Sequence, residues 1–82
     1  MIDEIFEVKS VRPYLKKRQL LKAYLKVKRY LLKGRYVSAS FKQRQPKGSG
    51  VWSFRINKQY RAFATFRQDG VLIVFKIDDH KR

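Results

Sequence analysis

The sequence predicts an α+β domain: an N-terminal strand, one or two helices, and then an antiparallel meander, with the helices packed on one face of the sheet. Three observations support this fold class. Residues 11–33 carry apolar side chains close to helical spacing, later segments alternate apolar and polar residues, and an Asp-Gly turn joins the last two segments. Because 82 residues suffice for only one core, we expect a single domain over residues 1–82.

The N-terminal half contains a short strand and a helical region. Residues 2–8 are moderately β-prone. Ser10 can cap a helix, Pro13 is tolerated in a first helical turn, and Gly34 is a natural helix end. The polar run at residues 16–19 can divide this region into two helices.

The C-terminal half predicts strands and turns. Alternation over residues 37–41 predicts one strand, and the Pro- and Gly-containing residues 43–50 predict a flexible basic loop. Three further strands are expected at residues 51–57, 60–67 and 71–77, the last two joined by the Asp-Gly hairpin turn.

Side chains alternate along a strand, so the meander should have two different faces. The apolar face, which the helices should cover, is expected to carry Trp52, Phe54, Ile56, Tyr60, Ala62, Ala64, Phe66, Val71, Ile73, Phe75 and Ile77. The opposite face is expected to carry Ser53, Arg55, Asn57, Arg61, Phe63, Thr65, Arg67, Leu72, Val74, Lys76 and Asp78. Its cations and single aromatic suit a phosphate backbone with a stacked base, although antiparallel sheets often have one polar, hydrated face.

Charge is the strongest compositional feature of the chain. The formal net charge is +15 at pH 7, and between Glu7 and Asp69 there are 18 basic residues and no acidic one. These cations cannot form ion pairs within that stretch, so they favour an anionic partner. Nucleic acid is the commonest such partner, and an acidic protein is the second.

One subset of these cations has helical spacing. Arg18, Lys22, Lys26, Arg29 and Lys33 should line one face of the helical region. Such a face is either a binding surface or a hydrated outer surface.

Several classes of protein are disfavoured. The chain has no cysteine and a single histidine, so we expect no disulfide, no metal site and no cofactor. Its uncharged runs, such as residues 36–41, are far too short to span a membrane, and its N-terminus lacks the order of a signal peptide. We therefore expect no membrane partner and a cytoplasmic location.

Residues 50–62, with the sequence GVWSFRINKQYRA, resemble the signature of the RelE/ParE toxin superfamily, in particular its HigB-like and RelE-like branch. There, a strand ending in Arg-Ile-Asn leads through a short turn to an aromatic-Arg pair. The final apolar strand and the ending Asp78-Asp79-His80-Lys81 look like the close of the family's sequences. The resemblance implies a RelE-like fold.

The resemblance also implies an activity. Members are toxins of type II toxin–antitoxin systems: they cut mRNA without metal, usually on the ribosome, and a cognate antitoxin silences them. By position, Arg61 matches the arginine that contacts the scissile phosphate, Arg55 the preceding cation, and His80 the C-terminal histidine. Further RNA-binding residues are expected at Lys42, Lys47, Lys58, Phe63, Lys76 and Lys81.

Elementary chemistry is compatible with these roles. Guanidinium groups match phosphate oxygens, and His80 is the only side chain whose ordinary pKa lies near neutrality. No tyrosine follows the last strand, where many members place a further catalytic residue, so the general acid and base are not assigned. Two alternatives stay open: a ParE-like inhibitor of DNA gyrase, and an RNA-binding module without catalytic activity.

Overall fold

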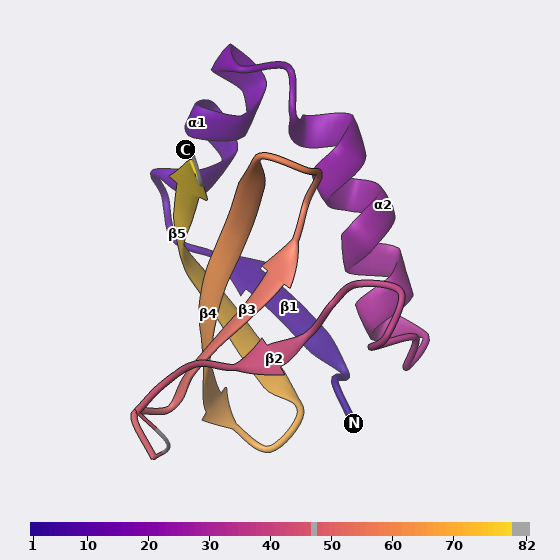
Figure 1. The fold of residues 1–82 in the computed structure, drawn as a ribbon, viewed down its shortest axis with the longest axis vertical. Coiled ribbons are helices and arrows are strands. Elements are labelled where there is room, and N and C mark those ends of the chain that lie inside the picture. Colours follow the sequence, from indigo (N-terminus) through magenta and orange to yellow (C-terminus); the bar gives the residue numbers. More distant parts are fainter. Residues whose placement is uncertain (47, 80–82) are drawn as a thin grey trace.

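A mixed five-stranded sheet forms the framework of the protein (Figure 1). The computed structural model describes residues 1–46 and 48–79. The strands are β1 (Glu4–Glu7), β2 (Lys42–Gln43), β3 (Val51–Arg55), β4 (Tyr60–Gln68) and β5 (Val71–Asp79), in the order β1-β5-β4-β3-β2. β1 runs parallel to β5, and the other neighbours are antiparallel. The predicted α+β class and the meander are therefore confirmed.

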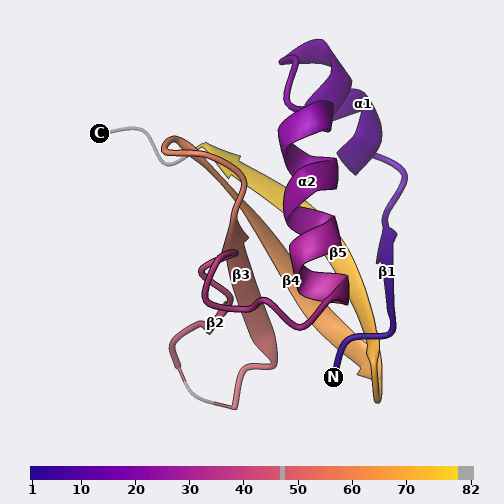
Figure 2. The same ribbon diagram turned by 90° about the vertical axis from the view of Figure 1, so that its right-hand side faces the viewer.

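Two helices, α1 (Val11–Lys17) and α2 (Leu21–Leu32), connect β1 to the rest of the sheet. The helical region divides where the polar run predicted a break, since Gln19 adopts a left-handed conformation with φ 58°. The Leu20 amide then donates to the Leu15 carbonyl at 2.8 Å, and α2 starts in a new direction (Figure 2). Neither helix of the described chain is long and apolar enough to cross a bilayer.

One apolar core lies between the helices and one face of the sheet. Leu15 from α1 and Tyr24 and Leu31 from α2 are fully buried against Phe54 and Leu72 from the strands. Full burial of side chains of this size removes enough apolar surface from water to hold short helices that would be unstable in isolation. The other face of the sheet, called the open face below, has no helix over it.

The break between the helices also changes the predicted line of cations. Arg18 follows α1, and its guanidinium carbon lies 3.5 Å from the centre of the Tyr14 ring. It therefore belongs to the end of α1, and the prediction that it continues the line on α2 is wrong.

The strand expected at residues 37–41 is also absent. This segment forms turns, with Ser40 at φ 53° and the Phe41 amide bonded to the Tyr36 carbonyl at 3.0 Å. Alternation suggested a strand, but only Ala39 is buried, and Val37 is fully on the surface. The short strand β2 begins one residue later, at Lys42.

In β5, the apolar residues that face the core are not the predicted ones. The pairing of β4 with β5 shifts between Phe63 and Ala64, because Phe63 faces Lys76 whereas Ala64 faces Val74. Phe75 is the extra residue of this bulge. Leu72 and Val74 are consequently in the core, and Phe75 is 39% exposed. The prediction was therefore wrong for four residues: it assigned Ile73 and Phe75 to the covered face and Leu72 and Val74 to the open face.

A carboxylate joins β1 to both helices. Glu7 accepts hydrogen bonds from the Tyr24 hydroxyl at 2.6 Å, the Lys28 ammonium at 2.9 Å and the Arg12 guanidinium at 3.3 Å. Burial alone would raise the pKa of Glu7, but the hydrogen bonds and the Lys28 charge hold it below its ordinary value. Burial, reinforced by the Glu7 charge, raises the pKa of the Tyr24 hydroxyl well above its ordinary value.

Candidate nucleic-acid interface

Cations gather on the open face where β2, β3 and β4 meet. Arg55 and Arg61 are direct cross-strand partners, and Lys42 lies opposite Ser53 on the neighbouring pair of strands. Directly opposed residues share a face of the sheet, so all four are on the open face. The predicted placement of Arg55 and Arg61 on one face is confirmed.

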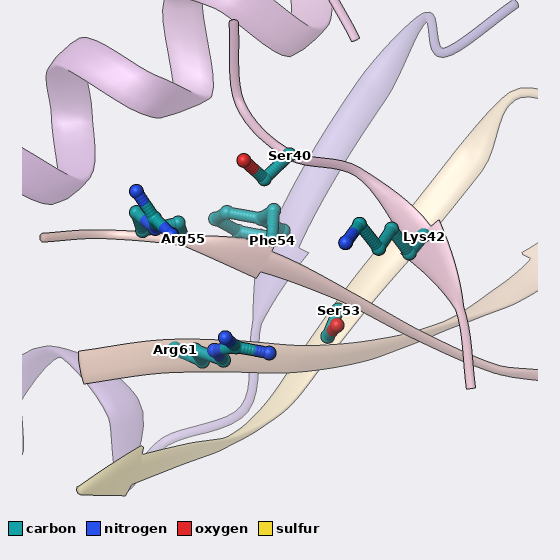
Figure 3. A pocket seen from close by; sticks show the side chains of 6 residues that line it. All are labelled: Ser40, Lys42, Ser53, Phe54, Arg55 and Arg61. Atoms are coloured by element: carbon teal, nitrogen blue, oxygen red, sulfur yellow. The ribbon is translucent and has the colours of Figure 1, made fainter. Parts of the chain in front are cut away.

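A small hollow lies among these residues (Figure 3). Its volume is about 30 Å³, close to that of one water molecule. The lining residues are Ser40, Lys42, Ser53, Phe54, Arg55 and Arg61. A hollow of this size can receive one oxygen atom of an anion, so a larger ligand would rest on the surface above it.

Among the described residues, no carboxylate pairs with the arginines at the hollow. In the described part of the chain, the only ion pairs within 4.0 Å are those of Glu7 with Arg12 and Lys28. Asp78 is opposite Arg61 on β5 without forming such a pair. Like charges directly opposite each other on a sheet are destabilising, so an anion bound here would relieve a repulsion within the fold.

The three cationic side chains around the hollow are kept apart, as their mutual repulsion favours. Figure 3 shows Arg61 extending along β4 toward Ser53, Lys42 reaching in from β2, and the Arg55 guanidinium standing apart at the end of β3. Arg61 is half-buried and Arg55 is exposed. The groups surround a common space without touching one another.

Two hydroxyl groups complete the lining. Ser53 is 2% exposed, so its hydroxyl belongs to a buried residue. Within the described residues, neither the Ser53 nor the Ser40 hydroxyl has a hydrogen-bond partner. Both can donate to an anion in the hollow. Alternation with Arg55 would have indicated Ser53, whereas the left-handed turn that brings in Ser40 has no clear sequence signal.

An aromatic ring lies next to the cations. Phe63 faces Ser53 on one side and Lys76 on the other, which places it within the same open face. The Arg44 guanidinium carbon is 5.6 Å from the centre of the Phe63 ring, a cation–π distance. The half-buried ring is flat and flanked by cations, as a stacked base requires.

The remaining predicted residues divide into two groups. Lys58 is exposed in the β3–β4 turn and does not line the hollow, whereas Lys76 lies across from Phe63 on the open face. Lys47, His80 and Lys81 lie outside the described residues. Asp79, which precedes these two C-terminal residues, accepts a hydrogen bond from the Gln59 side-chain amide at 2.9 Å.

This arrangement can bind a phosphodiester and stabilise added negative charge on it. Guanidinium, ammonium and hydroxyl donors surround one oxygen-sized space, and an aromatic ring lies beside them. Over the described ranges, no three side chains of His, Asp or Glu gather as a metal site would require.

Comparison with known proteins does not assign the chain to a family. No protein-family model matches the sequence, and no curated protein does so either.

Proposed function

We propose that this protein is the toxin of a type II toxin–antitoxin system, with a RelE-like fold, and that it cleaves mRNA in the cytoplasm, on the ribosome. A cognate antitoxin would hold it inactive. The observation that carries the proposal is a pair of arginines, without a carboxylate partner among the described residues, at a hydroxyl-lined hollow on an uncovered sheet face. The resemblance of residues 50–62 to the toxin signature adds the reaction type.

The proposed reaction uses the nucleophile that RNA carries. The 2′-hydroxyl loses its proton to a base and attacks the adjacent phosphorus, and the bond to the 5′-oxygen breaks as that oxygen gains a proton. The products are a 2′,3′-cyclic phosphate and a 5′-hydroxyl. Negative charge grows on the non-bridging oxygens during attack, so donors fixed around those oxygens lower the barrier.

Arg61 is suited to this role because it is half-buried and points into the hollow beside Ser53. Its planar fork can hold two phosphate oxygens, with Lys42 and Arg55 supplying charge from either side. Phe63 would stack an adjacent base, and the resemblance makes His80 the candidate for acid or base.

A second candidate function is RNA binding without cleavage. Its support is that the open face presents cations, hydroxyls and an aromatic ring, which are sufficient to bind a phosphate backbone and a base without any chemical step. The same surface would then hold RNA passively.

The decisive experiment compares Arg61→Ala with Arg67→Ala. Both arginines are on β4, and six residues of strand separate them by about 20 Å. The proteins are expressed briefly, and the 5′ ends of cellular mRNA are mapped. The unsubstituted chain and Arg67→Ala should stop growth and produce new 5′-hydroxyl ends within codons, whereas Arg61→Ala should do neither.

The other outcomes separate the alternatives. DNA damage with intact mRNA would instead identify an inhibitor of gyrase. A harmless unsubstituted chain that binds RNA through Arg61 would identify the passive module. Equal toxicity of the two arginine variants would remove the hollow from the mechanism.

A further inference from the structure

A second cationic surface lies on the helical side of the molecule, away from the open face. It consists of Lys22, Lys26 and Arg29 of α2 and Lys33, which caps the helix, and is called the α2 stripe below. All four side chains are exposed. The candidate RNA site uses none of them.

Helical geometry gives the stripe its direction. At 3.6 residues per turn the four positions fall within a sector of about 60°, and they extend over about 16 Å of helix. The buried residues Tyr24, Val27 and Leu31 are centred about 160° away around the same helix. Since those three residues face the sheet, the stripe points outward on the side opposite the open face.

The stripe adds little to the stability of the fold, because repulsion between its cations opposes the favourable position of Arg29 and Lys33 at the C-terminal end of the helix dipole. Spacings of four, three and four residues place like charges next to one another, at a cost of a few tenths of a kcal/mol for each pair. The first turn of α2 contains no acidic residue, and Lys22 lies there against the helix dipole. Lys28, on a different face of the same helix, is paired with Glu7 at 2.9 Å.

The chemistry of the stripe indicates its ligand. A protein interface requires apolar anchors at its centre, and the stripe contains only cations. Contacts with a phosphate backbone need charge alone and carry no requirement for a pocket. A rigid line of cations matches the regularly spaced phosphates of a duplex better than it matches the phosphates of a flexible single strand.

We propose that the α2 stripe binds the phosphate backbone of a double-stranded nucleic acid, independently of the candidate RNA site. The two surfaces are on opposite sides of a molecule about 25 Å thick, so both can be occupied at once. The protein would then hold a duplex segment on its helical side while a single strand occupies the open face.

The test measures binding of a fluorescein-labelled 12-base-pair RNA duplex, and the DNA duplex of the same sequence, by anisotropy over a range of salt concentrations. Lys22→Gln/Lys26→Gln/Arg29→Gln is compared with the control Lys9→Gln/Lys16→Gln/Lys17→Gln. The control removes the same charge from exposed positions outside both surfaces. Glutamine is a good helix former, and circular dichroism verifies folding.

The stripe variant should lower the duplex association constant about 100-fold at 0.1 M salt and reduce the slope of log K against log salt by about 3. The control should change the constant only a few-fold. Both duplexes should behave alike, since phosphate is the shared contact, and a preference for one would identify the natural source. Lys22→Arg/Lys26→Arg should retain binding.

Three results would overturn the proposal. These are an equal loss in the stripe and control variants, an unchanged salt slope, or tighter stripe-dependent binding of polyglutamate than of either duplex. Binding of a single-stranded 8-mer RNA is measured in parallel and should be lost in Arg61→Ala but retained in the stripe variant. This measurement tests the candidate RNA site separately, so a failure of the proposed nuclease function can be distinguished from a failure of the stripe proposal.

Discussion

Beneath the helices a carboxylate neutralises two cations, whereas on the open face no described carboxylate pairs with Arg55 or Arg61. On the helical side, the carboxylate of Glu7 pairs with Arg12 and Lys28 and accepts a hydrogen bond from the Tyr24 hydroxyl. On the open face, Arg55 opposes Arg61 with no described carboxylate within 4.0 Å. An acidic residue is thus present where buried cations need a counter-charge. The placement of Arg55 opposite Arg61 does not stabilise the fold and is better explained by binding of an anionic ligand.

The largest expected effect comes from giving the open face its own acid. Arg55→Glu places a carboxylate directly opposite Arg61. RNA cleavage should fall by about 10²- to 10³-fold, because the new ion pair neutralises the phosphate-binding arginine. The free energy of unfolding should rise by about 0.2–1 kcal/mol, the value of a favourable cross-strand pair.

Cleavage rates and urea denaturation measure both changes, with Arg67→Glu as the control. A variant that is both more stable and fully active would show that the arginines are not needed for cleavage.

The two sides of β5 should also respond unequally to truncation. Leu72→Ala should cost about 2–5 kcal/mol because it removes a fully buried side chain from the core. Phe75→Ala should cost less than about 1 kcal/mol, since that ring is largely outside the core. Denaturant unfolding of the two variants measures the difference, and the reverse ranking would contradict the bulge.

Removing the charge of Glu7 should destabilise the helical side. Glu7→Gln leaves the mostly buried Lys28 without a counter-charge, and the expected loss is about 2 kcal/mol. Glu4→Gln, at an exposed position of the same strand, should leave the melting temperature unchanged. Equal melting temperatures for the two variants would contradict the role given to Glu7.

The pKa of Glu7 makes this loss pH-dependent. Its pKa is lowered in the folded state, so its stabilising contribution is complete above the ordinary glutamate pKa and is lost as pH falls through the lowered value. The melting temperature of the unsubstituted protein should therefore decline below about pH 4.5 more steeply than that of Glu7→Gln. Parallel declines would show that other groups control acid unfolding.

The smallest expected effect is stabilisation by inorganic phosphate. At a concentration equal to its dissociation constant, phosphate should add about 0.4 kcal/mol, or about 2–3 °C in melting temperature. Arg55→Ala/Arg61→Ala should lose this increment relative to sodium chloride of matched ionic strength. An undiminished increment in that variant would place the bound phosphate elsewhere.

Much of the framework follows from local pattern. Helical spacing and the polar run at residues 16–19 predict two helices with a break, and the Asp-Gly turn predicts the last hairpin. The faces of β3 and β4 also follow from alternation, which is why Arg55 and Arg61 could be placed together.

What could not be predicted depends on contacts distant in sequence. A bulge adds one residue to β5 and reverses the faces of Ile73 and Val74, yet no turn residue marks it. The turn at Ser40 is held by pairing with β3, where the Arg55 amide donates to the Ala39 carbonyl. The role of Glu7 likewise depends on Lys28, which helical spacing alone does not bring near β1.

The parallel pairing of β1 with β5 has a consequence for biosynthesis. Glu4 pairs with Val71, so β1 cannot join the sheet until β5 has been synthesised. Contacts of such long range slow folding. Since β5 also provides Lys76 to the open face, a nascent chain should complete the candidate RNA-binding surface only after β5 has been made. Under the proposed function, the protein could not bind RNA while its own β5 is still being synthesised.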